Sequence, residues 1–468
     1  MSHSSKLARR AFLQRLGHLG IAGTAAPWAL NLAAISDAAA FTGGGDYKAL
    51  VCIFLNGGND HGNTVIPYDS TSHAEYVTAR GTTLTTAGGI VIARDRLAAT
   101  ALSAAGLTAG RQYALSPNLP RLKALYESGR LAVQMNVGPL VQPTTLAQYK
   151  NKSVPLPPKL FSHNDQQSVW QSSAAEGSTR GWGGQMGDLA LASNGGNSLF
   201  TCMSVTGNTV FLSGDSALAY RIGTAGATAI GPVTSNMYGS ATCRDALRTL
   251  ITGARTHVLE NELNTITRRS IDSQVTLSTA LAGGSTFLDK LPTGSGLGLN
   301  DQLRMVARLI QARSSLGLNR QVFMVSMGGF DHHDNLAAGH ATLMTRLDDA
   351  MAGFNAALDE IGAANLVTTF TASEFGRTIT SNGDGSDHAW GAHHFVMGGA
   401  VKGKSFYGTA PEAVAGGPED IGQGRYIPST SVDQYAATMA RWFGVSDTEM
   451  TQVAPSIGNF NSKYIGFL

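Results

Sequence analysis

Cysteine is scarce in this chain of 468 residues, which contains only Cys52, Cys202 and Cys243. No pair of them has the Cys-X-X-Cys spacing, which argues against a structural zinc site built from thiolates. Cys52 falls in an apolar run typical of a buried strand, where a thiol is inert. Cys202 and Cys243 are candidates for a disulfide in an oxidising compartment.

Charge and long apolar runs are also limited. Charged residues make up 14% of the chain, and the formal net charge is +2. No basic stripe is present, which argues against a nucleic-acid partner and favours a small molecule or a polymer. Beyond the first 40 residues no run approaches the roughly 20 apolar residues of a membrane-spanning helix, so we expect no transmembrane segment in the mature chain.

The first 40 residues look like an export signal. The pair Arg9-Arg10 precedes a weakly apolar run, Leu16 to Ile35, which is followed by three alanines. A membrane anchor is the alternative, but glycine and proline residues break the run. We therefore expect a twin-arginine signal peptide at 1–40, transport by the twin-arginine translocase, and a periplasmic or secreted mature protein.

Buried-strand patterns alternate with helical patterns along the rest of the chain. The runs from Leu50 to Leu55 and from Leu131 to Val137 are typical of buried strands, and a helical pattern ending at Gly129 precedes the second. Further strands are expected at 322–326, 366–370 and 395–397, with a long helix at 336–361. This alternation predicts an α/β fold, with a mostly parallel central sheet flanked by helices, in one domain at 41–468.

The segment at about 181–300 differs in composition, being rich in glycine, serine, threonine and alanine. It has strand-like runs at 199–205 and 209–212 and one helical run at 244–281. Long loops of small residues on α/β scaffolds commonly carry binding sites. We interpret this segment as a cap or insertion that shapes a substrate cleft.

Acids and histidines recur at the ends of the predicted strands. Ligands of open α/β sheets bind outside the carboxyl ends of the strands, so these side chains are expected to converge. Carboxylates and imidazoles are ligands of divalent ions such as zinc, manganese or calcium. The candidate metal ligands are Asp60, Asp331, His333, Glu374, Asp387 and His388.

Each candidate also has a structural alternative. Asp60 can bond its own turn, and Glu374 can form an ion pair with Arg377. Asp387 is either a ligand or a carboxylate that orients His388. Arg377 is a candidate catalytic residue, since a guanidinium can hold an anionic oxygen in bidentate fashion.

Ser162 is the candidate nucleophile. It precedes a helical run that extends to Trp170, so its hydroxyl either caps the helix or attacks a phosphate or sulfate ester bound at the helix N-terminus. A Ser-His-Asp triad would use the same hydroxyl. No Gly-X-Ser-X-Gly motif marks such a serine.

Several motifs together resemble the bacterial proteins of domain of unknown function 1501. They are the twin-arginine leader, Leu55-Asn56-Gly57-Gly58-Asn59-Asp60, Phe161-Ser162-His163, Gly181-Trp182, Phe330-Asp331-His332-His333-Asp334-Asn335, Ser373-Glu374-Phe375-Gly376-Arg377, Asp387-His388 and Gly398-Gly399-Ala400-Val401-Lys402-Gly403. The resemblance covers nearly the whole mature chain. That family in turn resembles the alkaline phosphatase and sulfatase superfamily, which implies a parallel sheet, two metal positions and a nucleophile at a helix N-terminus.

The superfamily resemblance implies a role for each candidate. Asp60 would be the first metal carboxylate, Ser162 the nucleophile, and His388 the late histidine. Asp331 and His333 would bind one metal, and Glu374 would bind the other.

The chain departs from the superfamily pattern at two positions. Glu374-Phe375 replaces an Asp-His pair, and Asn335 replaces a histidine. One metal site is therefore expected to be altered or absent. No Cys-X-Pro-X-Arg motif is present, which argues against a formylglycine nucleophile.

Three functions are consistent with these patterns. The first is an exported metal-dependent hydrolase of phosphate or sulfate esters. The second is a catalytically silent secreted protein that binds a glycan or another partner with the same fold. The third is a metal-independent serine esterase that uses Ser162.

Overall fold

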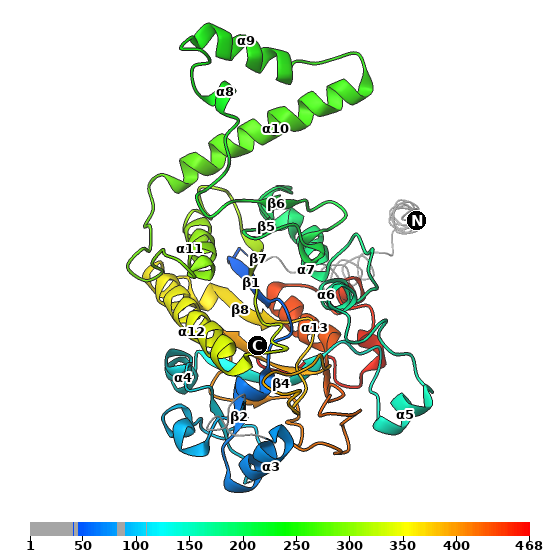
Figure 1. The fold of residues 1–468 in the computed structure, drawn as a ribbon. Coiled ribbons are helices and arrows are strands. Elements are labelled where there is room, and N and C mark those ends of the chain that lie inside the picture. Colours follow the sequence, from blue (N-terminus) through cyan, green and yellow to red (C-terminus); the bar gives the residue numbers. More distant parts are fainter. Residues whose placement is uncertain (1–40, 42–44, 82–88, 109) are drawn as a thin grey trace, which may run out of the picture.

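A computed structural model describes residues 41, 45–81, 89–108 and 110–468. The expected signal peptide at 1–40 lies outside these residues. Figure 1 shows a central sheet with helices on both faces and the C-terminus near the middle of the body. The described strands form a nine-stranded sheet in the order β10-β4-β9-β8-β1-β7-β5-β6, with β11 paired to β4.

β1 (Lys48–Leu55) lies inside this sheet and runs parallel to both of its neighbours, β7 (Arg320–Met327) and β8 (Val367–Ala372). Among the described strands of the sheet, β9 (Ala392–Met397) alone runs antiparallel to its neighbours, β8 and β4 (Leu131–Gly138). The expected mostly parallel sheet is thus confirmed. The remaining strands of the sheet are β5 (Cys202–Ser204), β6 (Ala219–Arg221), β10 (Phe406–Tyr407) and β11 (Thr430–Ser431).

The two faces of β1 explain the two helical layers. Val51 and Ile53 point to a cluster that includes α4 (Pro120–Glu127), α11 (Gly298–Gln311) and α12 (Leu336–Glu360). Leu50 and Phe54 point to a second cluster that includes α7 (Trp182–Ala190) and α13 (Val432–Phe443). A continuous apolar run is what a strand covered on both faces requires, because successive side chains alternate between the faces.

Other elements complete the body and its loops. β2 (Val65–Pro67) and β3 (Tyr113–Leu115) form a separate antiparallel pair. The remaining α-helices are α3 (Ser70–Arg80), α5 (Leu146–Asn151), α6 (His163–Ser172), α8 (Gly231–Thr234), α9 (Ala241–Thr252), α10 (Val258–Leu281) and α14 (Met450–Val453). None of the helices in the described part is long and apolar enough to cross a membrane.

The segment at 181–300 divides into two parts. Its first part supplies α7, β5 and β6 to the body, and the run at 209–212 is a 3-10 helix (Val210–Leu212) where we expected a strand. Its second part, the arm formed by α8, α9 and α10, projects away from the body (Figure 1). The helical run expected at 244–281 is two helices, because the chain turns between Thr252 and Val258.

The cysteine pairing that we considered does not occur. Cys202 is buried in β5, whereas Cys243 is exposed on α9, and both are free thiols. Cys52 is buried in β1 as expected, and burial raises the pKa of its thiol well above the usual value.

Candidate metal centre

The loops that follow β1, β7 and β8 meet at the carboxyl edge of the sheet. Gly57 and Gly58 make this contact possible, since both have a positive φ, of 118° and 85°. A Cβ atom on Gly57 would lie 2.4 Å from the backbone nitrogen of Asp331, and one on Gly58 would lie 2.5 Å from the Phe375 ring. Glycine is therefore required at both positions, for backbone conformation and for space.

Three imidazoles surround the Asp331 carboxylate. His163 at the start of α6 places Nε2 3.3 Å from Oδ2. His333 and His388 place Nε2 at 3.0 and 3.2 Å from Oδ1. The Nε2 atoms of His333 and His388 are themselves only 3.0 Å apart. His163, Asp331 and His388 have ligand atoms within 4.8 Å of one another, a grouping that could hold a metal ion.

Each of the three rings is held from behind by an oxygen. His163 Nδ1 lies 2.8 Å from Glu374 Oε1, and His333 Nδ1 lies 3.2 Å from Asp387 Oδ1. His388 Nδ1 lies 2.8 Å from the carbonyl oxygen of Phe161. Carboxylate and carbonyl oxygens accept hydrogen bonds, so each Nδ1 carries the proton and donates it.

In the neutral rings, this tautomer leaves three unprotonated Nε2 atoms facing one carboxylate. Lone pairs that converge on a carboxylate repel it unless a proton or a metal cation lies between them. Oxygen partners behind metal-binding histidines fix the ring orientation in the same way. The donor set of imidazole nitrogens and one carboxylate therefore fits a divalent cation such as zinc or manganese better than calcium, which prefers oxygen ligands.

The pKa shifts of Asp331 and His388 favour a metal ion in the cluster, whereas that of His163 favours a proton on its ring. Burial opposes ionisation of Asp331, but Arg377 and the adjacent histidines outweigh burial and lower its pKa. The hydrogen bond to Glu374 raises the pKa of His163. Burial lowers the pKa of His388, which favours the neutral ring that a metal ion needs.

Arg377 holds Asp331 rather than a substrate. Its side chain is fully buried, and Nη1 donates to Asp331 Oδ1 at 2.5 Å and to the Gly57 carbonyl at 3.3 Å. Nη2 donates to the Ser386 carbonyl and Nε to the Ser386 hydroxyl. The ion pair with Glu374 that we considered as the alternative does not form, and the bidentate binding of a substrate anion stays a prediction.

Glu374 lies behind the cluster and not in it. The carboxylate is fully buried and accepts hydrogen bonds from Gly57 N at 2.8 Å and Gln167 Nε2 at 3.2 Å, besides that from His163. This geometry makes Glu374 a positioning residue for His163, where the sequence had indicated a ligand. Asp387 has the same relation to His333, whereas we had considered it as the carboxylate that orients His388; the oxygen behind His388 is the carbonyl of Phe161 instead.

Ser162 occupies the N-cap of α6, as expected, but its hydroxyl makes a different bond from a capping bond. Ser162 Oγ donates to Asp165 Oδ2 at 2.7 Å, and Lys159 Nζ lies 3.3 Å from Asp165 Oδ1. No side-chain hydrogen bond caps the helix. The Asp165 carboxylate also accepts from its own backbone N–H, so His163 and Asn164 are the first-turn residues whose N–H groups have no partner among the described residues.

Asp60 is separated from the cluster and paired with another cation. Its buried Oδ1 accepts from Arg80 Nη2 at 2.6 Å, and both side chains are almost fully buried. Burial opposes ionisation, but Arg80 and the nearby His340 and His61 outweigh it, so the pKa of Asp60 is lowered. The guanidinium thus takes the place that the superfamily resemblance gives to a metal ion.

Sequence reasoning missed His163 as a member of the site. The available signal was its position in Phe161-Ser162-His163, directly after the candidate nucleophile. The adjacent histidines His393 and His394 are buried in β9, and neither joins the cluster.

Two buried histidines should make the fold sensitive to acid. Burial lowers the pKa values of His61 and His340 to about 4. These pKa values lie below the pKa of histidine in the unfolded chain, which is about 6.5. Stability is therefore retained above about pH 6.5 and lost as pH falls toward 4. Each ring should lower the free energy of unfolding by about 2 kcal/mol between pH 7.5 and pH 5.

This loss is measured by urea unfolding at the two pH values. A His340→Gln variant removes one titrating ring and should show a smaller loss than the parent. An equal loss in parent and variant would contradict the assignment to His340, and the exposed His257, changed to Gln, is the matched control.

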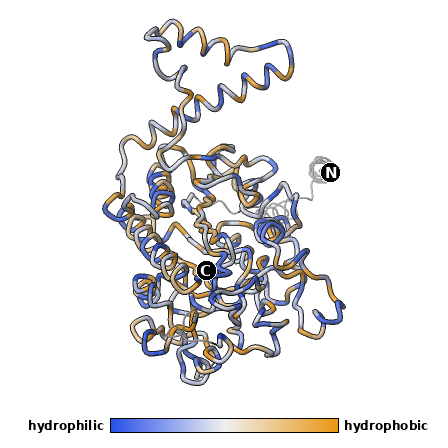
Figure 2. Tube along the Cα trace, in the orientation of Figure 1, coloured by the Kyte–Doolittle hydropathy of each residue, from blue (hydrophilic) through white to orange (hydrophobic). Residues whose placement is uncertain are grey.

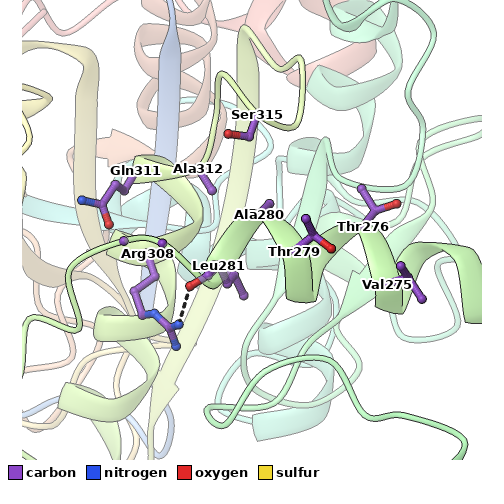
Figure 3. A pocket seen from close by; sticks show the side chains of 11 residues that line it. Val275, Thr276, Thr279, Ala280, Leu281, Arg308, Gln311, Ala312 and Ser315 are labelled. Atoms are coloured by element: carbon purple, nitrogen blue, oxygen red, sulfur yellow. Dashed lines mark hydrogen bonds between the residues drawn. The ribbon is translucent and has the colours of Figure 1, made fainter. Parts of the chain in front are cut away.

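The hollows of the surface include one at the base of the arm, away from the cluster. It has a volume of about 630 Å³ and lies between the end of α10 and α11. Figure 3 shows Arg308 reaching from α11 to the carbonyl oxygen of Leu281, at 3.0 Å. Threonine, glutamine and small apolar side chains supply most of the remaining lining, so this hollow has no cluster of metal ligands.

Comparison with known proteins gives a family and a distant likeness to solved structures. The family model described as "Protein of unknown function (DUF1501)" matches residues 47–455. Among solved structures, the chain is similar to that of Ps i-CgsB in complex with k-i-k-neocarrahexaose, with 10% identity and a TM-score of 0.36. That match covers 89% of this chain and 77% of the other. No curated protein matches the chain.

Proposed function

We propose that this chain, which belongs to the DUF1501 family, is an exported metal-dependent hydrolase of phosphate or sulfate esters. One observation carries the proposal. The Nε2 atoms of His163, His333 and His388 converge on the Asp331 carboxylate while an oxygen holds each ring from behind. Histidines that bind a metal ion are commonly held from behind by an oxygen in this way.

The metal ligands in this proposal are His163, Asp331 and His388, with His333 beside them. A bound divalent cation would polarise the ester and lower the pKa of a coordinated water. Glu374 and Asp387 keep two of the rings in the required tautomer. Arg377 keeps Asp331 in place and partly neutralises its charge, which limits the affinity of the site for cations.

The first turn of α6 is the proposed place for the anionic group of the ester. The N–H groups of His163 and Asn164 and the helix dipole attract phosphate or sulfate oxygens. His163 is the first residue of this helix, so an anion bound there would lie next to the cluster. Ser162 stands at the same end and remains the candidate nucleophile, with Asp165 as the acceptor of its hydrogen bond.

Metal removal tests this proposal. We expect about one equivalent of divalent metal in the purified mature protein, and hydrolysis of aryl phosphates or aryl sulfates that stops after chelation and returns when metal is restored. Elemental analysis and a chromogenic ester assay on the same preparation measure both.

The rival functions give different results. Hydrolysis that survives chelation but is lost in Ser162→Ala would replace the proposal with the serine esterase. Bound metal without turnover of any ester would replace it with the silent binding protein. No bound metal after soaking in zinc or manganese would overturn the metal site itself.

A further inference from the structure

The arm exposes apolar side chains that the body leaves uncovered. In α10, Val258, Leu259, Leu263 and Ile266 have exposed fractions of 78%, 74%, 63% and 52%. α9 has no buried residue. Figure 2 shows apolar positions distributed along the arm where it projects from the body. A row of large apolar side chains exposed in this way marks a surface that another molecule covers.

The exposed residues form one stripe on α10. Leu259, Leu263 and Ile266 are spaced by four and three residues, so they lie on one side of the helix. The opposite side is held by the chain around α9: Asn264 Nδ2 donates to the Gly253 carbonyl at 2.6 Å, and Arg268 Nε donates to the Thr252 carbonyl at 3.2 Å. At about 100° per residue, the stripe points roughly away from α9.

The charged residues beside the stripe of one copy are complementary to the same residues of a second copy. Glu262 and Arg269 are seven residues apart on one flank of the stripe, and the ion pair between α9 and α10 in the described part of the chain, Arg248–Asp272, involves neither of them. If two copies of α10 pack antiparallel about an axis between Leu263 and Ile266, Leu263 of each copy faces Ile266 of the other. Glu262 of each copy then lies beside Arg269 of the other, twice by symmetry.

We propose that this chain forms a homodimer through the arm, with the Leu259, Leu263 and Ile266 stripes of two copies packed antiparallel. A self-complementary patch of this kind gives a closed twofold interface. The stripe is short, so the dimer should form at micromolar concentrations and weaken with salt, since the flanking pairs are at the rim.

Charge reversal tests the dimer and its register together. Sedimentation velocity of the mature parent protein should show a dimer, and Leu263→Asp should be monomeric. Glu262→Arg and Arg269→Glu should each raise the dissociation constant at least about tenfold, because each places like charges in contact. The double variant should return to within roughly threefold of the parent.

The arm offers a matched control, because Asp245→Arg reverses a charge of the same arm on α9, away from the stripe. That variant should dimerise like the parent. A monomeric parent at all concentrations, including one whose arm binds lipid vesicles or a different protein, would overturn the proposal. A dimer that is unaffected by Leu263→Asp would overturn it as well.

Discussion

A His388→Ala variant is expected to lose its bound metal and to hydrolyse phosphate or sulfate esters at least about 100-fold more slowly than the parent. Changes in residues that merely orient metal ligands cost about 10–100-fold, so the loss of a ligand should cost more. Asp331→Ala should have an equal or larger effect, because Asp331 is the point on which all three rings converge. Elemental analysis and kcat/KM measure the two effects separately.

Two further variants make this experiment specific. Glu374→Gln preserves the shape of the side chain behind His163. Its metal content and kcat/KM should fall between those of the parent and those of His388→Ala. His257→Ala, which changes an exposed imidazole of the arm, should leave metal content and hydrolysis unchanged. Full metal content in both His388→Ala and Asp331→Ala would remove the cluster as the metal centre.

The pair of Asp60 and Arg80 should instead control stability. Asp60→Ala leaves a buried guanidinium without its carboxylate, and breaking a buried pair in this way costs about 3–5 kcal/mol. The variant should unfold at lower urea concentration and, while folded, keep its metal. Joint replacement of Asp60 by Ala and Arg80 by Met removes both charges and should recover part of the loss.

An exposed pair provides the comparison. Arg121 and Asp349 are 3.2 Å apart at the surface, and Asp349→Ala should cost about 0–1 kcal/mol. If Asp60→Ala kept its stability but lost metal, the superfamily role of Asp60 as a metal carboxylate would be correct, and the structural role given to it here would be wrong.

The sheet was predictable because its strands are apolar on both faces. Runs such as Leu50 to Leu55 are typical of strands in the middle of a parallel sheet. The antiparallel direction of β9 was not predictable, because a short apolar run has no direction. The projection of the arm from the segment interpreted as a cap or insertion was not predictable, since helical spacing in a small-residue segment does not show which way the segment points.

The site was predictable in part for a related reason. Strand ends converge by topology, which brought Asp331, His333 and His388 together as expected. Which side chain bonds to which within the site depends on three-dimensional geometry that cannot be read from the sequence. Neither the pairing of Asp60 with Arg80, 20 residues away, nor the support of His163 by Glu374 leaves a spacing signal.

The position of β1 between β7 and β8 also sets the order in which this chain can fold. β1 is made of residues 48–55, yet its hydrogen-bonded neighbours begin at Arg320 and Val367. At about 5–20 residues per second, a ribosome needs roughly 13–53 s to reach β7 after β1 is made. During that time an eight-residue apolar strand has no partner, so productive folding waits for nearly the entire polypeptide and depends on protection of its N-terminal part from aggregation.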